Sequence, residues 1–226
     1  MEIIVFSYFD KPRRMRNSKR WNTVEKQADK GRNWQAMNDR EWEQKGVFCV
    51  DASVPDAAAA LQDALLACLA EADKRRELVL VCIGTDRATG DSLGPLTGHL
   101  LSARLPGVPV YGTLERPVHA QNLHQSLAHV FAVHDDPLVI AVDACLGAHT
   151  RVGWLTVARR PLRPGTAVRK TLPCVGDVSV MGTVSGGGGE ELSALQNTRL
   201  YLVMRMADVI ADGLAGAVRI KKEGGA

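Results

Sequence analysis

The 226-residue sequence predicts an α/β protein in which a mostly parallel sheet lies between helices, as a three-layer α/β/α arrangement. Two continuous apolar runs, at residues 78–83 and 138–142, have the length and composition of strands buried on both faces. Stretches with apolar residues three or four positions apart, typical of amphipathic helices, occur between the strands. Strands that alternate with helices favour a parallel sheet with right-handed crossovers.

Each element follows from a local pattern. The first helix is expected to begin near Ser53, in a sequence that resembles a capping box, and basic residues at 74–76 close it because cations suit a helix C-terminus. Pro95 falls in the first turn of the helix after the loop at 84–90, where proline is tolerated. The other expected elements are strands at 78–83, 108–112, 138–142, 152–157 and 178–184, and helices at 93–101, 119–133 and 190–214.

The chain divides into three parts by composition. Residues 1–46 form a basic extension with 11 lysines and arginines against 7 aspartates and glutamates, and they contain three of the four tryptophans. Residues 47–216 form the α/β/α domain, and residues 217–226 form a polar C-terminal tail. A disordered tail would rarely carry three tryptophans, so the extension is expected to pack onto the domain or onto a partner.

Charge and cysteine usage exclude several classes of protein. Outside the extension, 17 basic residues balance 18 acidic ones, so no direct nucleic-acid binding is expected. The sequence shows no secretory signal and no apolar run long enough to span a bilayer, which predicts a cytoplasmic protein without membrane contact. The five cysteines include no CxxC pair, so free thiols in a reducing compartment are expected rather than a zinc site.

Five chemically useful side chains are predicted at one edge of the sheet, because function in an open parallel sheet collects at the carboxyl ends of strands. Asp143 directly follows the strand at 138–142, and the other four lie in the segments after the two preceding strands. These four candidates are Asp86, Asp91, Glu115 and His119.

Asp91 and Asp143 are the residues expected to carry the chemistry. Two carboxylates in one partly buried cleft cannot both ionise cheaply, so one keeps a proton and acts as an acid while the other acts as a base toward water. Such a pair suffices for peptide hydrolysis without a cofactor; with His119 the same carboxylates would equally suit a divalent metal ion.

Each candidate also has a structural alternative. Asp91 would serve as a helix N-cap, Asp143 as a hydrogen-bonded group at a strand end and His119 as a local contact, while Asp86 and Glu115 would be solvated loop carboxylates. The glycine-bounded loop at 84–91 lacks the GK[ST] ending of a phosphate-binding loop, which argues against nucleotide binding.

Several short motifs resemble those of the YyaC-like sporulation proteins, and together they cover about residues 78–214. That family is similar in turn to the germination protease of spore-forming bacteria, and its wider fold includes the hydrogenase maturation proteases. The motifs are CIGTDR at 82–87, TGDSLGP at 89–95, YGTL at 111–114, PVHA at 117–120, AVDACLG at 141–147, VGD at 175–177 and LQNTRL at 195–200.

The resemblance implies a peptidase-like domain. The germination protease cleaves small acid-soluble spore proteins through two aspartates without a metal, and Asp91 and Asp143 match those two positions. The resemblance thus implies a sporulation- or germination-associated peptidase in the cytoplasm, including that of the forespore. Hydrogenase maturation proteases bind a metal through acidic residues and a histidine, roles open to Asp91, Asp143 and His119.

Two further points stay open at the level of the sequence. A third function, a non-catalytic sporulation protein that binds peptides in the same cleft, fits the residues as well, because a cleft without activity can keep its aspartates for binding. The sequence also leaves open whether the chain forms a homo-oligomer.

Overall fold

A computed structural model describes residues 46–73, 75–164, 172–187 and 191–223. The expected basic extension at 1–46, apart from Gly46, lies outside the described residues. In chain order the elements are β1 (Val47–Asp51), α4 (Ala57–Leu69), β2 (Leu78–Cys82), the short 3-10 helix η2 (Gly90–Ser92), α5 (Leu93–Arg104), β3 (Val110–Tyr111), α6 (Leu123–Val133), β4 (Leu138–Gly147), η3 (His149–Arg151), β5 (Trp154–Ala158), β6 (Val178–Gly186), α7 (Glu191–Gln196) and α8 (Leu200–Glu223).

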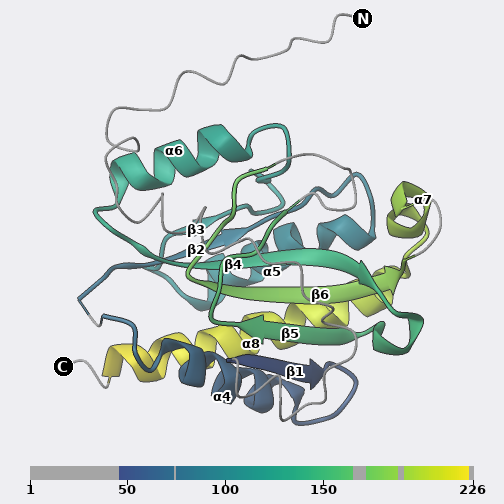
Figure 1. Cartoon of the computed structure of the whole chain (residues 1–226), viewed down its shortest axis with the longest axis horizontal. Coiled ribbons are helices and arrows are strands. Elements are labelled where there is room, and N and C mark those ends of the chain that lie inside the picture. Colours follow the sequence, from purple (N-terminus) through teal and green to yellow (C-terminus); the bar gives the residue numbers. More distant parts are fainter. Residues whose placement is uncertain (1–45, 74, 165–171, 188–190, 224–226) are drawn as a thin grey trace, which may run out of the picture.

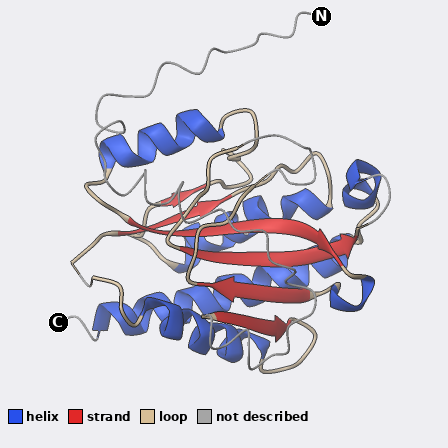
Figure 2. Cartoon of the chain, viewed as in Figure 1, coloured by secondary structure: helices blue, strands red, loops and turns tan. Residues whose placement is uncertain are grey.

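Six strands form one mixed sheet in the order β1-β5-β6-β4-β2-β3 (Figure 2). The pairs β2–β3, β2–β4 and β4–β6 are parallel, whereas β5 is antiparallel to both of its neighbours. All strands except β5 therefore point the same way, and the predicted α/β class with a mostly parallel sheet is confirmed.

Helices cover the two faces of the sheet unequally (Figure 1). On one face α4, α5 and α8 pack over a large core that includes the fully buried side chains of Leu61, Leu101 and Ile210. On the other face α6 packs over a smaller core with Val79 and Val139. The strand β4 is ten residues long; its first six residues are buried and its last four are only partly buried.

The first helix differs from the prediction at both ends. The backbone N–H of Ser53 donates to Asp51 Oδ1 at 2.8 Å, so residues 53–56 form turns instead of a capping box, and α4 begins at Ala57. The helix ends at Leu69, before the basic residues at 74–76. The strand β1 that precedes it has no counterpart in the prediction, although it completes one edge of the sheet.

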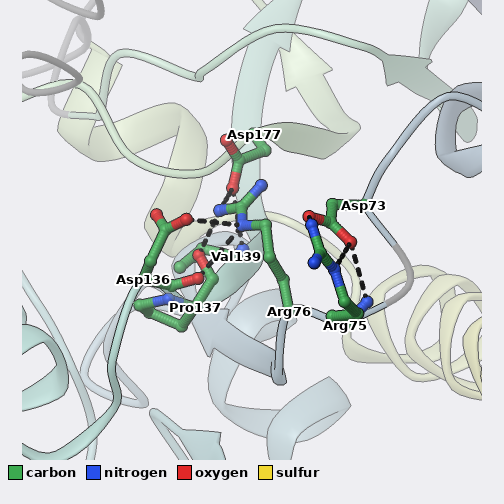
Figure 3. Close-up of polar contacts among 7 residues, drawn as sticks. All are labelled: Asp73, Arg75, Arg76, Asp136, Pro137, Val139 and Asp177. Carbon is green, nitrogen blue, oxygen red and sulfur yellow. Dashed lines mark hydrogen bonds and ion pairs between the residues drawn. The ribbon is translucent and has the colours of Figure 1, made fainter.

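Arg76, expected to close that helix, instead links the amino ends of several strands (Figure 3). Its guanidinium donates to Asp177 Oδ2 at 3.0 Å and to the carbonyls of Asp136 and Pro137, and the backbone N–H of Val139 donates to the same Asp177 oxygen at 3.0 Å. The Arg76 side chain is only 13% exposed. These contacts join the starts of β2 and β4 to the segment before β6. They lie at the amino ends of the parallel strands, opposite to the candidate site.

The C-terminal region also differs from the expectation of one helix at 190–214. The helix is interrupted between α7 and α8, where the side chain of Thr198 donates to the carbonyl of Ala194 at 2.8 Å. From there α8 extends to Glu223, so the expected boundary at residue 216 lies inside a helix whose Ala217 and Val218 are buried. Among the described helices, none combines the length and hydrophobicity needed to cross a bilayer.

Candidate active site

Asp143 is positioned by the alternation of side chains along β4. Val139 and Ala141 face α6 and are buried, and Asp143 is the next residue in the same series. The prediction placed it just after the strand, but β4 continues to Gly147 because β6 pairs with it that far. Asp143 is therefore held inside the sheet, with 8% of its surface exposed. Its Oδ1 accepts the backbone N–H of Ala144 at 2.9 Å.

Asp91 is positioned by a close contact between η2 and the end of β2. The backbone N–H of Thr85 donates both to Asp91 Oδ2 at 3.0 Å and to the Asp91 carbonyl at 3.1 Å. This approach requires glycine at two places: a Cβ on Gly84 would lie 2.0 Å from the Asp91 carbonyl oxygen, and a Cβ on Gly94 would lie 2.0 Å from that of Ile83. The N-cap alternative for Asp91 is not observed, since its carboxylate binds Thr85 and makes no cap hydrogen bond.

The two carboxyl groups influence each other electrostatically. Burial, and then repulsion from Asp91, raise the pKa of Asp143 well above its usual value, although the Ala144 N–H acts in the opposite direction. Burial also raises the pKa of Asp91, against the lowering effects of the Thr85 hydrogen bond and of His119. The more buried Asp143 is therefore the carboxyl group that retains a proton, and Asp91 is the one that ionises first.

One oxygen of each carboxyl group stays available for chemistry. Among the contacts of the described residues, Asp91 Oδ1 and Asp143 Oδ2 receive no hydrogen bond. The backbone N–H groups that hold the partner oxygens fix both carboxyl groups in place. Two carboxyl groups, each with one oxygen that receives no such bond, are thus held at the carboxyl end of the sheet.

His119 lies in the same cleft, on the segment between β3 and α6. Its backbone N–H donates to Asn122 Oδ1 at 2.8 Å, and the Asn122 amide donates to the Pro117 carbonyl at 2.9 Å, which fixes the turn. The backbone N–H of Gln121 donates to His119 Nδ1 at 3.3 Å. Because Nδ1 acts as an acceptor, the neutral ring carries its proton on Nε2.

These three side chains line a cleft of about 480 Å³. Its walls come from the loop after β2, the partly buried end of β4, α7, and the residues Arg163, Pro164 and Leu172. Ile83, Leu146 and Leu195 supply apolar surface, and Cys145 lies beside the aspartates, with Sγ 3.6 Å from Thr183 Oγ1. Burial raises the pKa of the Cys145 thiol, so this cysteine stays a neutral thiol.

The other two predicted site residues lie outside the cleft. Asp86 is exposed on the loop after β2 and does not line the cleft. The Glu115 side chain is 83% exposed and lies 4.0 Å from Arg116. Strand polarity thus predicted the correct edge of the sheet, but the loops turn these two carboxylates toward solvent.

Several residues that build the site were not predicted. Gly84 and Gly94 allow the close approach of η2, and Thr85 supplies the N–H that orients Asp91. The glycines are visible in the sequence, but their purpose depends on contacts between segments ten residues apart. All five cysteines are free thiols, and of these Cys68 and Cys82 are buried.

The donor set does not fit a bound metal ion. Within the described residues, no three His, Cys, Asp or Glu side chains are grouped closely enough to hold one. His119 would bind a metal through an unprotonated Nε2, which would move its proton to Nδ1 and set it against the N–H of Gln121. For His119 to act as a third ligand beside Asp91 and Asp143, this contact with Gln121 would have to be broken.

Fold and site together define an α/β protein with a pair of carboxylic acids at the carboxyl end of a mixed sheet. The model of the family described as "Protein of unknown function (DUF1256)" matches residues 48–213, and the chain belongs to this family.

A curated relative and a solved structure are similar to the chain. The chain is 49% identical over 162 residues to the uncharacterized protein YyaC of Bacillus subtilis strain 168, covering 71% of this chain and 79% of that protein. The predicted membership of the YyaC-like proteins is thus confirmed. The crystal structure of the NiFe hydrogenase maturation protease HycI from Thermococcus kodakarensis KOD1 has a TM-score of 0.49 and 20% identity, covering 69% of this chain and 98% of that one.

Proposed function

We propose that the chain is a peptidase that hydrolyses peptide bonds with Asp91 and Asp143 as its catalytic pair. The observation that carries the proposal is the raised pKa of both carboxyl groups, most strongly that of Asp143, in a cleft of about 480 Å³. Perturbed carboxyl pairs in clefts are characteristic of acid–base sites.

The proposed reaction needs one proton on the pair. Ionised Asp91 removes a proton from a water molecule, whose oxygen attacks the carbonyl carbon of the peptide bond. Protonated Asp143 donates its proton to the carbonyl oxygen, which gives a neutral tetrahedral diol. Asp91 then passes its proton to the leaving nitrogen as the C–N bond breaks, and Asp143 regains a proton from the diol hydroxyl. The carboxyl pair ends in its starting state.

His119 has a supporting role in this proposal. The Gln121 N–H at Nδ1 selects the tautomer with the proton on Nε2, so this nitrogen acts as a hydrogen-bond donor. A donor near Asp91 stabilises negative charge there and on the carbonyl oxygen as the diol forms.

The substrate proposed is a protein that is degraded during sporulation or germination, and small acid-soluble spore proteins are the first class to test. Support comes from the sequence motifs shared with the YyaC-like sporulation proteins and from their similarity to the germination protease. Such substrates imply action in the cytoplasm of the forespore.

The test is cleavage of purified small acid-soluble spore proteins by wild-type protein and by Asp91→Asn and Asp143→Asn, with and without a chelator. Asp86→Asn is the matched control, because Asp86 is an exposed carboxylate on the same loop as Thr85. We expect wild type and Asp86→Asn to cleave equally in chelator and both pair variants to lose at least 100-fold in rate.

Other outcomes distinguish the alternatives. Loss of wild-type cleavage on chelation would instead support a metal-dependent peptidase with Asp91, Asp143 and His119. Binding of the substrate without any cleavage would support a non-catalytic peptide-binding protein. Wild-type rates in either pair variant would refute the proposal.

A further inference from the structure

A second groove adjoins the candidate active site. It has a volume of about 690 Å³ and lies between β3, the loop that follows β3, and α6. This volume falls within the range of roughly 300–1,000 Å³ found for ligand sites. His119 lines both this groove and the cleft with the aspartate pair, so the two cavities meet at that side chain.

The wall of the groove includes a backbone position whose hydrogen-bonding groups are directed away from the neighbouring strand. Leu80 of β2 is the register partner of Val110, and the Leu80 N–H donates to the Pro109 carbonyl at 2.9 Å. In a parallel pair with this pattern, the hydrogen bonds to β2 come from the residues before and after Val110. The N–H and C=O of Val110 itself therefore point away from β2. Since β3 is the last strand of the sheet, they point outward from the sheet (Figure 1).

Several side chains of the groove are polar donors or acceptors, beside the apolar Val110, Pro117 and Val118. Gln125, Ser126 and His129 contribute from α6, and Glu115 and Arg116 contribute opposite charges from the loop after β3. A lining of mixed polarity without one dominant charge suits the amides of a polypeptide better than an apolar or strongly charged ligand.

One wall of the groove is supported by a hydrogen-bond network centred on the buried His134. Tyr111 OH lies 2.9 Å from His134 Nε2, and His134 Nδ1 lies 2.8 Å from Glu77 Oε2. His134 is only 8% exposed, so the tyrosine at the groove is fixed from behind. A preformed wall lowers the entropy lost on binding.

We propose that this groove binds an extended segment of the polypeptide substrate on one side of the scissile bond, alongside β3 and hydrogen-bonded to the N–H and C=O of Val110. This inference rests on the proposed function, because it assumes that the substrate continues from the groove toward Asp91 and Asp143. Addition of a strand to an open sheet edge is a common way for proteins to bind peptides. His119 marks the point where the segment passes from the groove into the cleft.

The test measures binding separately from cleavage. A fluorescently labelled small acid-soluble spore protein is titrated with the Asp143→Asn protein, and the dissociation constant is read from fluorescence anisotropy. Two further substitutions are added to this background. Ser126→Trp fills the groove, and Val110→Pro removes the outward N–H, a change that edge strands tolerate. Ala132→Trp, at an exposed position of α6 that does not line the groove, is the control.

We expect Ser126→Trp to raise the dissociation constant at least tenfold and Val110→Pro to raise it about fivefold, as for loss of one hydrogen bond. Ala132→Trp should leave it within twofold. Equal affinities in all variants, or no binding of the probe by Asp143→Asn, would overturn the groove proposal. Cleavage by the wild-type protein is scored independently, so failure of the peptidase proposal is recognised by binding without hydrolysis.

Discussion

Replacement of Asp143 by asparagine should make the folded protein more stable at neutral pH. Folding buries this carboxyl group and raises its pKa well above the usual value. The folded state therefore binds more protons than the unfolded chain between the ordinary aspartate pKa, about 3.9, and the raised pKa, so stability falls as pH rises through that window. Each unit of elevation corresponds to about 1.4 kcal/mol.

Asp143→Asn removes this penalty while its side-chain oxygen can still accept the Ala144 N–H. We expect the free energy of unfolding at pH 7 to rise by at least about 1 kcal/mol, equivalent to about 2–4 °C in Tm for a domain of this size. The gain should shrink as the pH is lowered toward 4, because Asp143 is then protonated in both states.

The effect is measured by urea unfolding between pH 4.5 and pH 8, with circular dichroism as the signal. Asp63→Asn is the control, since Asp63 is an exposed carboxylate on α4 and its loss should change stability by less than about 0.5 kcal/mol at every pH. Equal or lower stability of Asp143→Asn at pH 7, or a gain that does not depend on pH, would refute the assignment of the proton to Asp143.

Three further predictions concern the framework and the site. Arg76→Ala should destabilise the fold by about 2 kcal/mol, because it removes the guanidinium contacts of the Asp177 carboxylate and of two backbone carbonyls (Figure 3). Arg75→Ala, at a side chain that is 90% exposed, should change the stability by less than about 0.5 kcal/mol in urea unfolding. Gly94→Ala should lower the free energy of unfolding by about 3 kcal/mol and lower the cleavage rate, because its Cβ would lie 2.0 Å from the Ile83 carbonyl oxygen. Gly187→Ala, whose Cβ would have its nearest contact at 3.7 Å, is the control. Equal stability of the two variants would contradict the close approach at Gly94. His119→Ala should lower kcat for substrate cleavage by about 100-fold with little change in KM, and His119→Gln should retain more activity because its amide can donate; equal loss in both would argue against the donor role.

Local sequence patterns predicted most of the fold. The buried runs became β2 and the start of β4, and the leucine periodicities became α4, α5 and α8. The parts that differ depend on contacts between distant segments. Residues 53–56 have the composition of a helix start, but the N–H of Ser53 donates to the Asp51 carboxylate and the helix begins only at Ala57. The strand β1 pairs with β5 across a large separation, with Val47 opposite Ala158, and the reversed direction of β5 depends on its pairing with β6. No local pattern encodes either pairing.

For the candidate site, strand polarity predicted which residues could meet, but not which of them would. Asp91, Asp143 and His119 line one cleft, whereas Asp86 and Glu115 belong to the same edge of the sheet and face solvent. The difference lies in the backbone of the loops. Gly84 and Gly94 allow the Asp91 segment to approach β2 closely, whereas Asp86 lies on an exposed part of the loop.

The placement of Asp143 within β4, rather than after it, explains how the carboxyl pair can persist. Asp143 has a register partner on β6, and Asp91 is tied to Thr85 by both its carboxylate and its carbonyl. Neither side chain can swing into water without breaking backbone hydrogen bonds. Their mutual repulsion is therefore relieved by binding a proton instead of by movement, as the proposed acid–base hydrolysis requires.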